Sequence, residues 1–238
     1  FIGWFKSVSS ALYHNCVIKT DNSLQCFGGF IPQAPNDLGT VKQISLSAEY
    51  ECAMKTNGSG LCWGIARDFG QVKAVAAGYH HQCYIASDLT VGCTGDNNVG
   101  QQNVPQGLTA LDIAAGYSHT CAIKASDQNL ACWGLNSSGQ ATVPNDLAKV
   151  KKVSLGDKHS CVIKDSNELY CWGANDKGQL DIPNDLGAVS DLVLGYDFTC
   201  AVKASDKNLV CFGENSNSQT NVPNDLGKIL DPISFTAQ

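Results

Sequence analysis

The sequence predicts an all-β protein, a β-propeller of six short antiparallel blades (seven possible) with one disulfide inside each blade. Three observations predict it. Twelve cysteines fall into six pairs, 10 or 11 residues apart, and successive pairs start 31 to 40 residues apart. The segments around the pairs carry strand and turn signals without a helical period. A fixed period of this size indicates stacked copies of one supersecondary unit, so residues 1–238 are expected to form a single domain of six repeats of ~37 residues.

The clearest repeat, residues 150–187, shows the expected elements in order. Strands are predicted at residues 150–155, 159–164 and 168–173, separated by a turn at 156–158 and a hairpin loop at 165–167. A loop rich in Asn, Asp and Gly follows and ends at Pro183-Asn184-Asp185. Six such three- or four-stranded units can close as a propeller, which leaves only short strand edges exposed.

Two parts of the chain depart from this pattern. In the second repeat Trp63-Gly64 runs almost directly into Arg67-Asp68, which indicates loss of the long loop while the strands remain. Residues 229–238 resemble the first strand of a seventh repeat. They are expected to act as a closing strand that latches the ring. The alternatives are a truncated repeat or a strand offered to a neighbouring molecule in self-assembly.

Each cysteine pair is expected to form a disulfide within its own repeat. Folding a hairpin about Ser166 places Cys161 opposite Cys171, at a Cα separation of about 4.5 Å that suits a disulfide. A metal site would need clustered ligands such as Cys-x2-Cys, and the sequence has none. The expected pairs are Cys16–Cys26, Cys52–Cys62, Cys83–Cys93, Cys121–Cys132, Cys161–Cys171 and Cys200–Cys211.

Composition restricts compartment and partners. The net charge of −6 argues against a nucleic-acid partner or an anionic membrane, and no apolar run is long enough to span a bilayer. Paired cysteines indicate an oxidising compartment, so the protein is expected to be secreted or extracellular. No signal peptide is visible, and the chain begins at Phe1, as a processed product would. Asn57-Gly58-Ser59 and Asn136-Ser137-Ser138 are glycosylation sequons in a predicted turn and loop.

The repeat resembles that of the regulator of chromosome condensation family. The resemblance rests on Gly156-Asp157-Lys158-His159-Ser160 with Tyr170-Cys171-Trp172-Gly173, and on Gly116-Tyr117-Ser118-His119-Thr120 with Trp133-Gly134. The ending Gly139-Gln140-Ala141-Thr142-Val143-Pro144 is similar to the short blades of β-lactamase inhibitor protein II. The resemblance implies a β-propeller, usually seven-bladed, and members that act as exchange factors, inhibitors or interaction platforms. The cysteine pairs depart from its intracellular members, and the acidic chain disfavours a nuclear exchange factor.

Three residue types recur at fixed places and have both a structural and a functional interpretation. Histidines two residues before the first cysteine are expected to fill a packing niche rather than to bind metal: His14, His81, His119 and His159. Lysines three residues after it are expected to lie along the sheet rather than to form an anion site: Lys19, Lys55, Lys124, Lys164 and Lys203. Aromatics after the second cysteine are expected to pack between blades rather than to stack on sugars: Phe27, Trp63, Trp133, Trp172 and Phe212.

The turn before each first cysteine is the predicted binding region. Its residues vary while its frame stays fixed, and variable loops on a rigid scaffold often carry binding. Tyrosine is a favoured anchor. In β-lactamase inhibitor protein II the corresponding turns form the inhibitory face, so the resemblance implies the same region. The alternative is an ordinary solvated rim. The candidate residues are Tyr13, Glu49, Tyr79, His80, Tyr117, Asp157, Lys158, Tyr196 and Asp197.

The sequence therefore predicts a secreted, non-enzymatic propeller that binds another macromolecule through these turns. No catalytic motif is present, and no cofactor or metal is expected. The expected partner is an extracellular protein. A lectin, or a structural subunit of an extracellular assembly, is the alternative.

Overall fold

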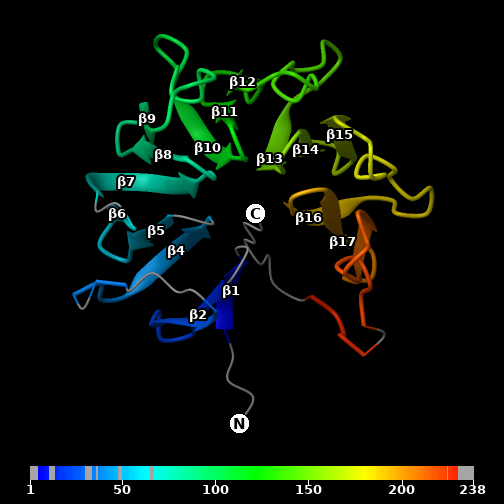
Figure 1. Ribbon diagram of the computed structural model, residues 1–238, viewed down its shortest axis with the longest axis horizontal. Coiled ribbons are helices and arrows are strands. Elements are labelled where there is room, and N and C mark those ends of the chain that lie inside the picture. The colour runs from blue at the N-terminus through cyan, green and yellow to red at the C-terminus, as the bar shows by residue number, and fades with distance from the viewer. Residues whose placement is uncertain are drawn as a thin grey trace.

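The protein is a fan of small antiparallel sheets set around a common centre (Figure 1). The computed structural model describes residues 5–10, 14–29, 34–35, 37–47, 50–64, 67–223 and 225–229. Every regular element among them is a strand, and 18 strands form six blades of three. Within these ranges no helix has the length and apolar character needed to cross a bilayer. The predicted all-β propeller is confirmed.

The strands alternate in direction within each blade and follow chain order outward. The first three blades contain β1 (Phe5–Ser10), β2 (His14–Lys19), β3 (Leu24–Gly28); β4 (Val41–Leu46), β5 (Glu51–Lys55), β6 (Ser59–Trp63); and β7 (Arg67–Ala77), β8 (His81–Ala86), β9 (Val91–Gly95). The last three contain β10 (Ala110–Ala115), β11 (His119–Lys124), β12 (Leu130–Gly134); β13 (Val150–Leu155), β14 (His159–Lys164), β15 (Leu169–Gly173); and β16 (Val189–Leu194), β17 (Phe198–Lys203), β18 (Leu209–Gly213).

The predicted disulfides are all formed, one between the second and third strand of each blade. Cys161 lies directly opposite Cys171, with Cα atoms 4.1 Å apart. The Cα separation in the other five pairs is 4.0 or 4.1 Å, and no cysteine is free. Each bridge therefore fixes the register of one hairpin.

Strand β7 joins the second and third blades into one sheet. Its first half pairs with β6, from Cys62 opposite Arg67 to Ser59 opposite Gln71. Its second half pairs with β8, from Val72 opposite Ala86 to Ala77 opposite Gln82. The loss of the long loop between these repeats is thus confirmed. The short connection also lets the chain add a fourth strand to the second blade before it starts the third.

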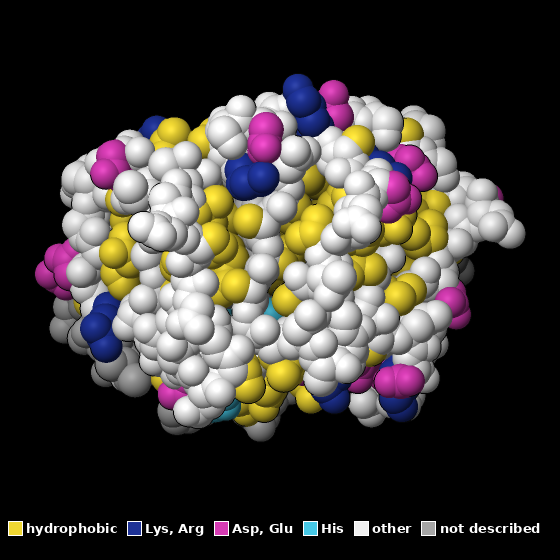
Figure 2. Space-filling model, turned by 90° about the horizontal axis from the view of Figure 1, so that it is seen from above, with side chains coloured by type: hydrophobic (Ala, Val, Ile, Leu, Met, Phe, Trp, Pro, Cys, Tyr) yellow, Lys and Arg dark blue, Asp and Glu magenta, His cyan; other side chains and the backbone are white. Residues whose placement is uncertain are grey.

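The hydrophobic core is divided among the interfaces between successive blades. Between the fourth and fifth blades, for example, Ile123 and Leu130 pack with Val153 and Trp172. Similar clusters join each blade to the next from the first to the sixth. In Figure 2 hydrophobic side chains fill furrows between polar ridges at the edge of the fan, and basic side chains lie beside acidic ones.

No such cluster joins the described residues of the sixth blade to those of the first. The predicted closing strand lies outside the described residues apart from Ile229. Within the described part of the chain, the first and sixth blades therefore stand at the two ends of the series of packed interfaces.

Candidate functional site

Four of the predicted binding residues form one aromatic cluster: Tyr79, His80, Tyr117 and Tyr196. They come from the turns that join the first to the second strand of the third, fourth and sixth blades. The rings of Tyr79 and Tyr117 stack with centroids 4.3 Å apart, and His80 meets Tyr79 edge-on, also at 4.3 Å. Tyr196 lies edge-on to Tyr117 at 6.0 Å and is 52% exposed. Turns far apart in sequence thus present one aromatic surface to solvent.

Backbone hydrogen bonds link these turns to one another. The N–H of Tyr79 donates to the carbonyl of Gly116, that of Tyr117 to Gly156, and that of Asp157 to Tyr196, over 3.0 to 3.3 Å. A Cβ atom on Gly116 would lie 2.6 Å from the Gly156 oxygen, so only glycine permits this approach. The aromatic cluster therefore sits on a pre-organised frame, which reduces the entropy lost on binding.

The remaining described candidates form a charged corner beside Tyr196. The Asp157 carboxylate is buried, accepts a hydrogen bond from the Tyr196 hydroxyl and lies 3.9 Å from the Lys158 ammonium. Burial raises the pKa of Asp157 and of Asp197. Burial, together with the Asp157 charge, raises the pKa of Tyr196 to about 12, so this hydroxyl remains a hydrogen-bond donor at neutral pH. Tyr13 and Glu49 lie outside the described residues.

The four histidines lie buried at the interfaces between blades, as the packing interpretation predicted. Three of them also hydrogen-bond to a hydroxyl of the next blade: His81 to Thr120 (2.8 Å), His119 to Ser160 (2.9 Å) and His159 to Thr199 (3.1 Å). Burial lowers the pKa of His81 and His159 to about 4 and that of His119 to about 3, so each is neutral at pH 7.

The sequence interpretation missed the hydroxyl partners. Thr120, Ser160 and Thr199 directly precede the first cysteine of their repeats, and this recurrence was the available signal. Each hydroxyl in turn donates to a backbone carbonyl of the preceding blade, at Gln101, Gln140 and Gln179. Because the hydroxyl proton is already donated to a carbonyl, only the lone pairs of the hydroxyl oxygen can accept a hydrogen bond from the imidazole. The histidine Nε2 must therefore carry the proton.

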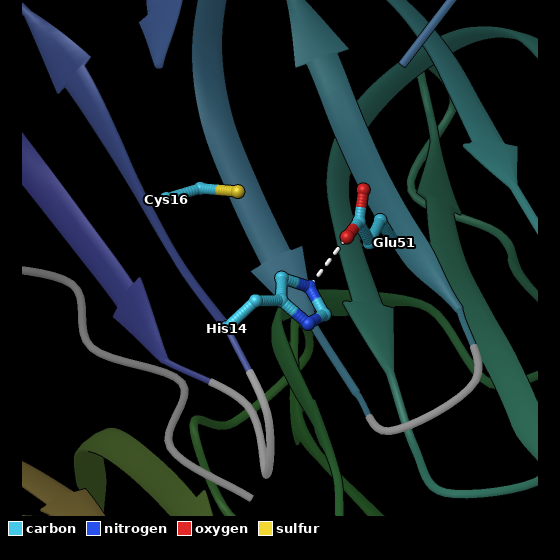
Figure 3. A group of neighbouring side chains, drawn as sticks. All are labelled: His14, Cys16 and Glu51. Atoms are coloured by element: carbon cyan, nitrogen blue, oxygen red, sulfur yellow. Dashed lines mark ion pairs between the residues drawn. The ribbon is translucent and has the colours of Figure 1, made fainter. Parts of the chain in front are cut away.

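The first interface replaces the hydroxyl with a carboxylate. The imidazole of His14 meets the carboxyl group of Glu51 in a buried contact between the first and second blades, beside Cys16 (Figure 3). Burial raises the pKa of Glu51 to about 7 and lowers that of His14. The potential ligand atoms of these three residues lie within 4.8 Å of one another. Because the Cys16 sulfur is bonded to Cys26, it supplies no thiolate for a metal.

The repeated aromatics pack between blades at four of the five positions. Trp63, Trp133, Trp172 and Phe212 are buried, and the indole N–H groups of Trp133 and Trp172 donate to the Gln101 and Gln140 carbonyls. The prediction is wrong for Phe27, which is 49% exposed. Phe27 belongs to the first blade, and no described blade packs on that side of it.

The lysines of the repeated series bind acceptors close to their own blades. Four of the five ammonium groups bind acceptors within their own blade and its loops. Lys55 bonds to the Asp37 carbonyl and Lys203 to that of Asp185, while Lys124 pairs with Asp127 and Lys164 with Glu168. Their charges are thereby engaged locally and kept apart.

The two sequons differ in how their amides are held. In Asn57 the side-chain oxygen accepts bonds from the backbone N–H and hydroxyl of Ser59, on an exposed turn. In Asn136 both ends of the amide close a loop, since Nδ2 donates to the Thr142 hydroxyl and Oδ1 accepts from the Ala141 N–H.

Comparison with known families identifies the repeat. Residues 111–140 and 150–179 match the model of the regulator of chromosome condensation (RCC1) repeat. The chain contains RCC1-like repeats. These two segments are the fourth and fifth repeats, which contain Tyr117, Asp157 and Lys158. No curated protein sequence matches the chain.

Solved structures share the fold of this RCC1-like propeller. The ectodomain of the receptor kinase CR4 from Physcomitrella patens superposes with a TM-score of 0.75 at 23% identity, over 87% of this chain and 60% of that one. The chain thus spans less than two thirds of the CR4 ectodomain. The CRINKLY WD40 ectodomain of ACR4 from Arabidopsis thaliana gives 0.73 at 24%, over 88% and 79%. Prp20p from Saccharomyces cerevisiae gives 0.79 at 15%, over 95% and 76%.

Proposed function

We propose that this RCC1-like propeller is an extracellular, non-enzymatic protein that binds another protein through the aromatic cluster. The observation that carries the proposal is the meeting of Tyr79, His80, Tyr117 and Tyr196 from three blades on one rigid frame. Tyrosine offers a large contact area at low entropy cost, and aromatic residues are enriched where binding energy concentrates.

Two further observations support this function. Six disulfides suit an oxidising compartment. Two of the similar structures are receptor-kinase ectodomains, and the Prp20p structure was studied for its binding to Gsp1p and histones. The charged corner of Asp157, Lys158 and Asp197 would give a partner polar groups for orientation beside the apolar rings.

Capture from the native extracellular fluid, followed by mass spectrometry, tests the proposal. The immobilised protein is expected to retain one protein reproducibly, and a variant with Tyr79, Tyr117 and Tyr196 all changed to alanine should lose at least 90% of it. Tyr170→Ala is the matched control, because Tyr170 lies on β15 against Trp172 and Lys164, outside the cluster. Equal capture by the triple variant would overturn the proposal. If the wild-type protein captures its partner from untreated fluid but not from enzymatically deglycosylated fluid, the result would instead support a lectin.

A further inference from the structure

Acidic side chains from the fifth and sixth blades gather beside the aromatic cluster. The Asp157 carboxylate accepts a hydrogen bond from the Tyr196 hydroxyl, and Asp197 directly follows Tyr196 in the chain. Burial raises the pKa of Asp197, and the nearby charges of Glu214 and Asp176, in the loops after the two blades, add to this rise. The charged corner therefore extends into these loops.

Basic side chains balance only part of this acidic charge. The Lys158 ammonium lies 3.9 Å from the Asp157 carboxylate, and the Lys177 ammonium lies 2.9 Å from that of Glu214. Asp197 forms no ion pair with any other described residue. Four carboxylates against two ammonium groups leave a local net charge of −2 when all are ionised. The charge of the site thus complements a positively charged group.

The tyrosine rings suit a cation that can also stack. The rings of Tyr117 and Tyr196 stand at 88° to each other, and Tyr196 is 52% exposed, so a side chain of a partner can reach it. The face of an aromatic ring carries negative charge density and attracts cations. A guanidinium group can stack on a ring and bond to a carboxylate with its edge, whereas an ammonium group is compact and strongly hydrated. An exposed ring next to the Asp197 carboxylate therefore favours arginine over lysine.

We propose that the aromatic cluster and Asp197 receive an arginine side chain of the protein partner. This inference rests on the proposed function and specifies the chemistry of that partner. The guanidinium group would stack on Tyr196 and donate hydrogen bonds to the Asp197 carboxylate. Lys158 would oppose its approach, because the Lys158 ammonium acts on both Asp157 and Asp197 from the same corner.

Titration of the full-length protein with short capped peptides, followed by NMR, tests the proposal. A Gly-Arg-Gly peptide should shift the ring signals of Tyr196 in a saturable manner. A peptide with citrulline in place of arginine has nearly the same shape without the charge, and it should bind about threefold more weakly or less. A Gly-Lys-Gly peptide should also bind more weakly than the arginine peptide.

Two single substitutions should change the affinity for the arginine peptide in opposite directions. Asp197→Asn should weaken binding about threefold or more, and Lys158→Gln should strengthen it about twofold. Asp146→Asn is the matched control, because it removes an exposed carboxylate from the loop after the fourth blade and should leave the affinity unchanged. An unaltered melting temperature and an intact disulfide map verify that each variant is folded. A merely structural role of Asp197 and Lys158 would not produce opposite changes.

Three results would overturn the proposal: equal affinity for the arginine and citrulline peptides, tighter binding of the lysine peptide, or weaker binding of the arginine peptide by Lys158→Gln. None of them bears on whether the triple tyrosine variant loses its captured protein. The proposed function and the arginine contact can therefore fail separately.

Discussion

The Nε2 proton of His119 is donated to the hydroxyl of Ser160 in the next blade, over 2.9 Å, and that hydroxyl donates to the Gln140 carbonyl over 2.8 Å. The same relay spans the interfaces on either side, through His81 with Thr120 and His159 with Thr199. Each relay satisfies polar groups that water cannot reach. Buried hydrogen bonds therefore help to hold neighbouring blades in register across their apolar interfaces.

Removing the relay hydroxyl should destabilise the fold. Ser160→Ala leaves the His119 N–H and the Gln140 carbonyl without their partner, which should lower the free energy of unfolding by about 1 to 3 kcal/mol. Ser160→Thr is the control and should stay within about 0.5 kcal/mol, since threonine holds the equivalent place at 120 and 199. Denaturant titration measures both. Equal stability of the two variants would contradict the relay.

The buried histidines should make the protein sensitive to acid. Their folded pKa values lie at about 3 to 4, below 6.5, so their contribution is complete above pH 6.5 and is lost as pH falls toward 4. Each of these three histidines should lower the free energy of unfolding by about 2 kcal/mol at pH 5 relative to pH 7.5. His159→Phe, which copies Phe198, should reduce this loss in denaturant titrations. An unchanged pH profile of His159→Phe would refute the assignment.

Glu51, which contacts His14 between the first two blades, should make stability depend on pH with the opposite sign. The folded pKa of Glu51 is raised from 4.5 to about 7, so its contribution is present at low pH and is lost as pH rises through 7. Glu51→Gln cannot titrate, and its stability relative to the wild type should be higher at pH 8 than at pH 5. Exposed Glu168→Gln serves as the control. This role would be excluded if denaturant titrations gave the same stability difference between Glu51→Gln and the wild type at both pH values.

A single disulfide should stabilise its own blade by a modest amount. Replacing Cys161 and Cys171 together by alanine should lower the free energy of unfolding by roughly 2 to 3 kcal/mol, because the closed loop is short. The denaturant midpoint reports the change. Peptide mapping should find the other five pairs intact, and bridges between blades would contradict the local pairing.

The two sequons should tolerate glycans differently. A glycan on Asn57 leaves the bonds of its side-chain oxygen in place, whereas one on Asn136 sits on the nitrogen that bonds to Thr142. Secretion from a glycosylating eukaryotic host should yield glycan at Asn57, and the fraction modified at Asn136 should have the lower melting temperature. Peptide mass spectrometry and thermal denaturation of the separated forms measure this. Equal stability of the two forms would argue against it.

The fold was largely predictable because each repeat encodes its own hairpins. The predicted strand at 159–164 coincides with β14, and Cys161 faces Cys171 as expected. Contacts between repeats were harder to read, since no local pattern states which residue of the next blade a side chain meets. The hydroxyl of Ser160 was therefore missed as the partner of His119, and Phe27 was wrongly expected to be buried.

The sequence selected the turns of the candidate site but did not show how they meet. The selection rested on variable turns within a fixed frame and on the tyrosines that those turns carry. That Tyr117 meets Tyr79 and Tyr196 at once depends on how far neighbouring blades rotate about the common centre, which the repeat length does not specify.

Strand β7 makes one part of the fan stiffer than the rest. Elsewhere successive blades are joined by side-chain packing and by single backbone bonds between loops, such as that from the Tyr117 N–H to the Gly156 carbonyl, and the stability of such arrays is close to a sum over repeats and their interfaces. Across β7 a continuous ladder of backbone bonds runs from β4 to β9. The second and third blades are therefore a single cooperative element, and a pull on the chain would meet its stiffest region there.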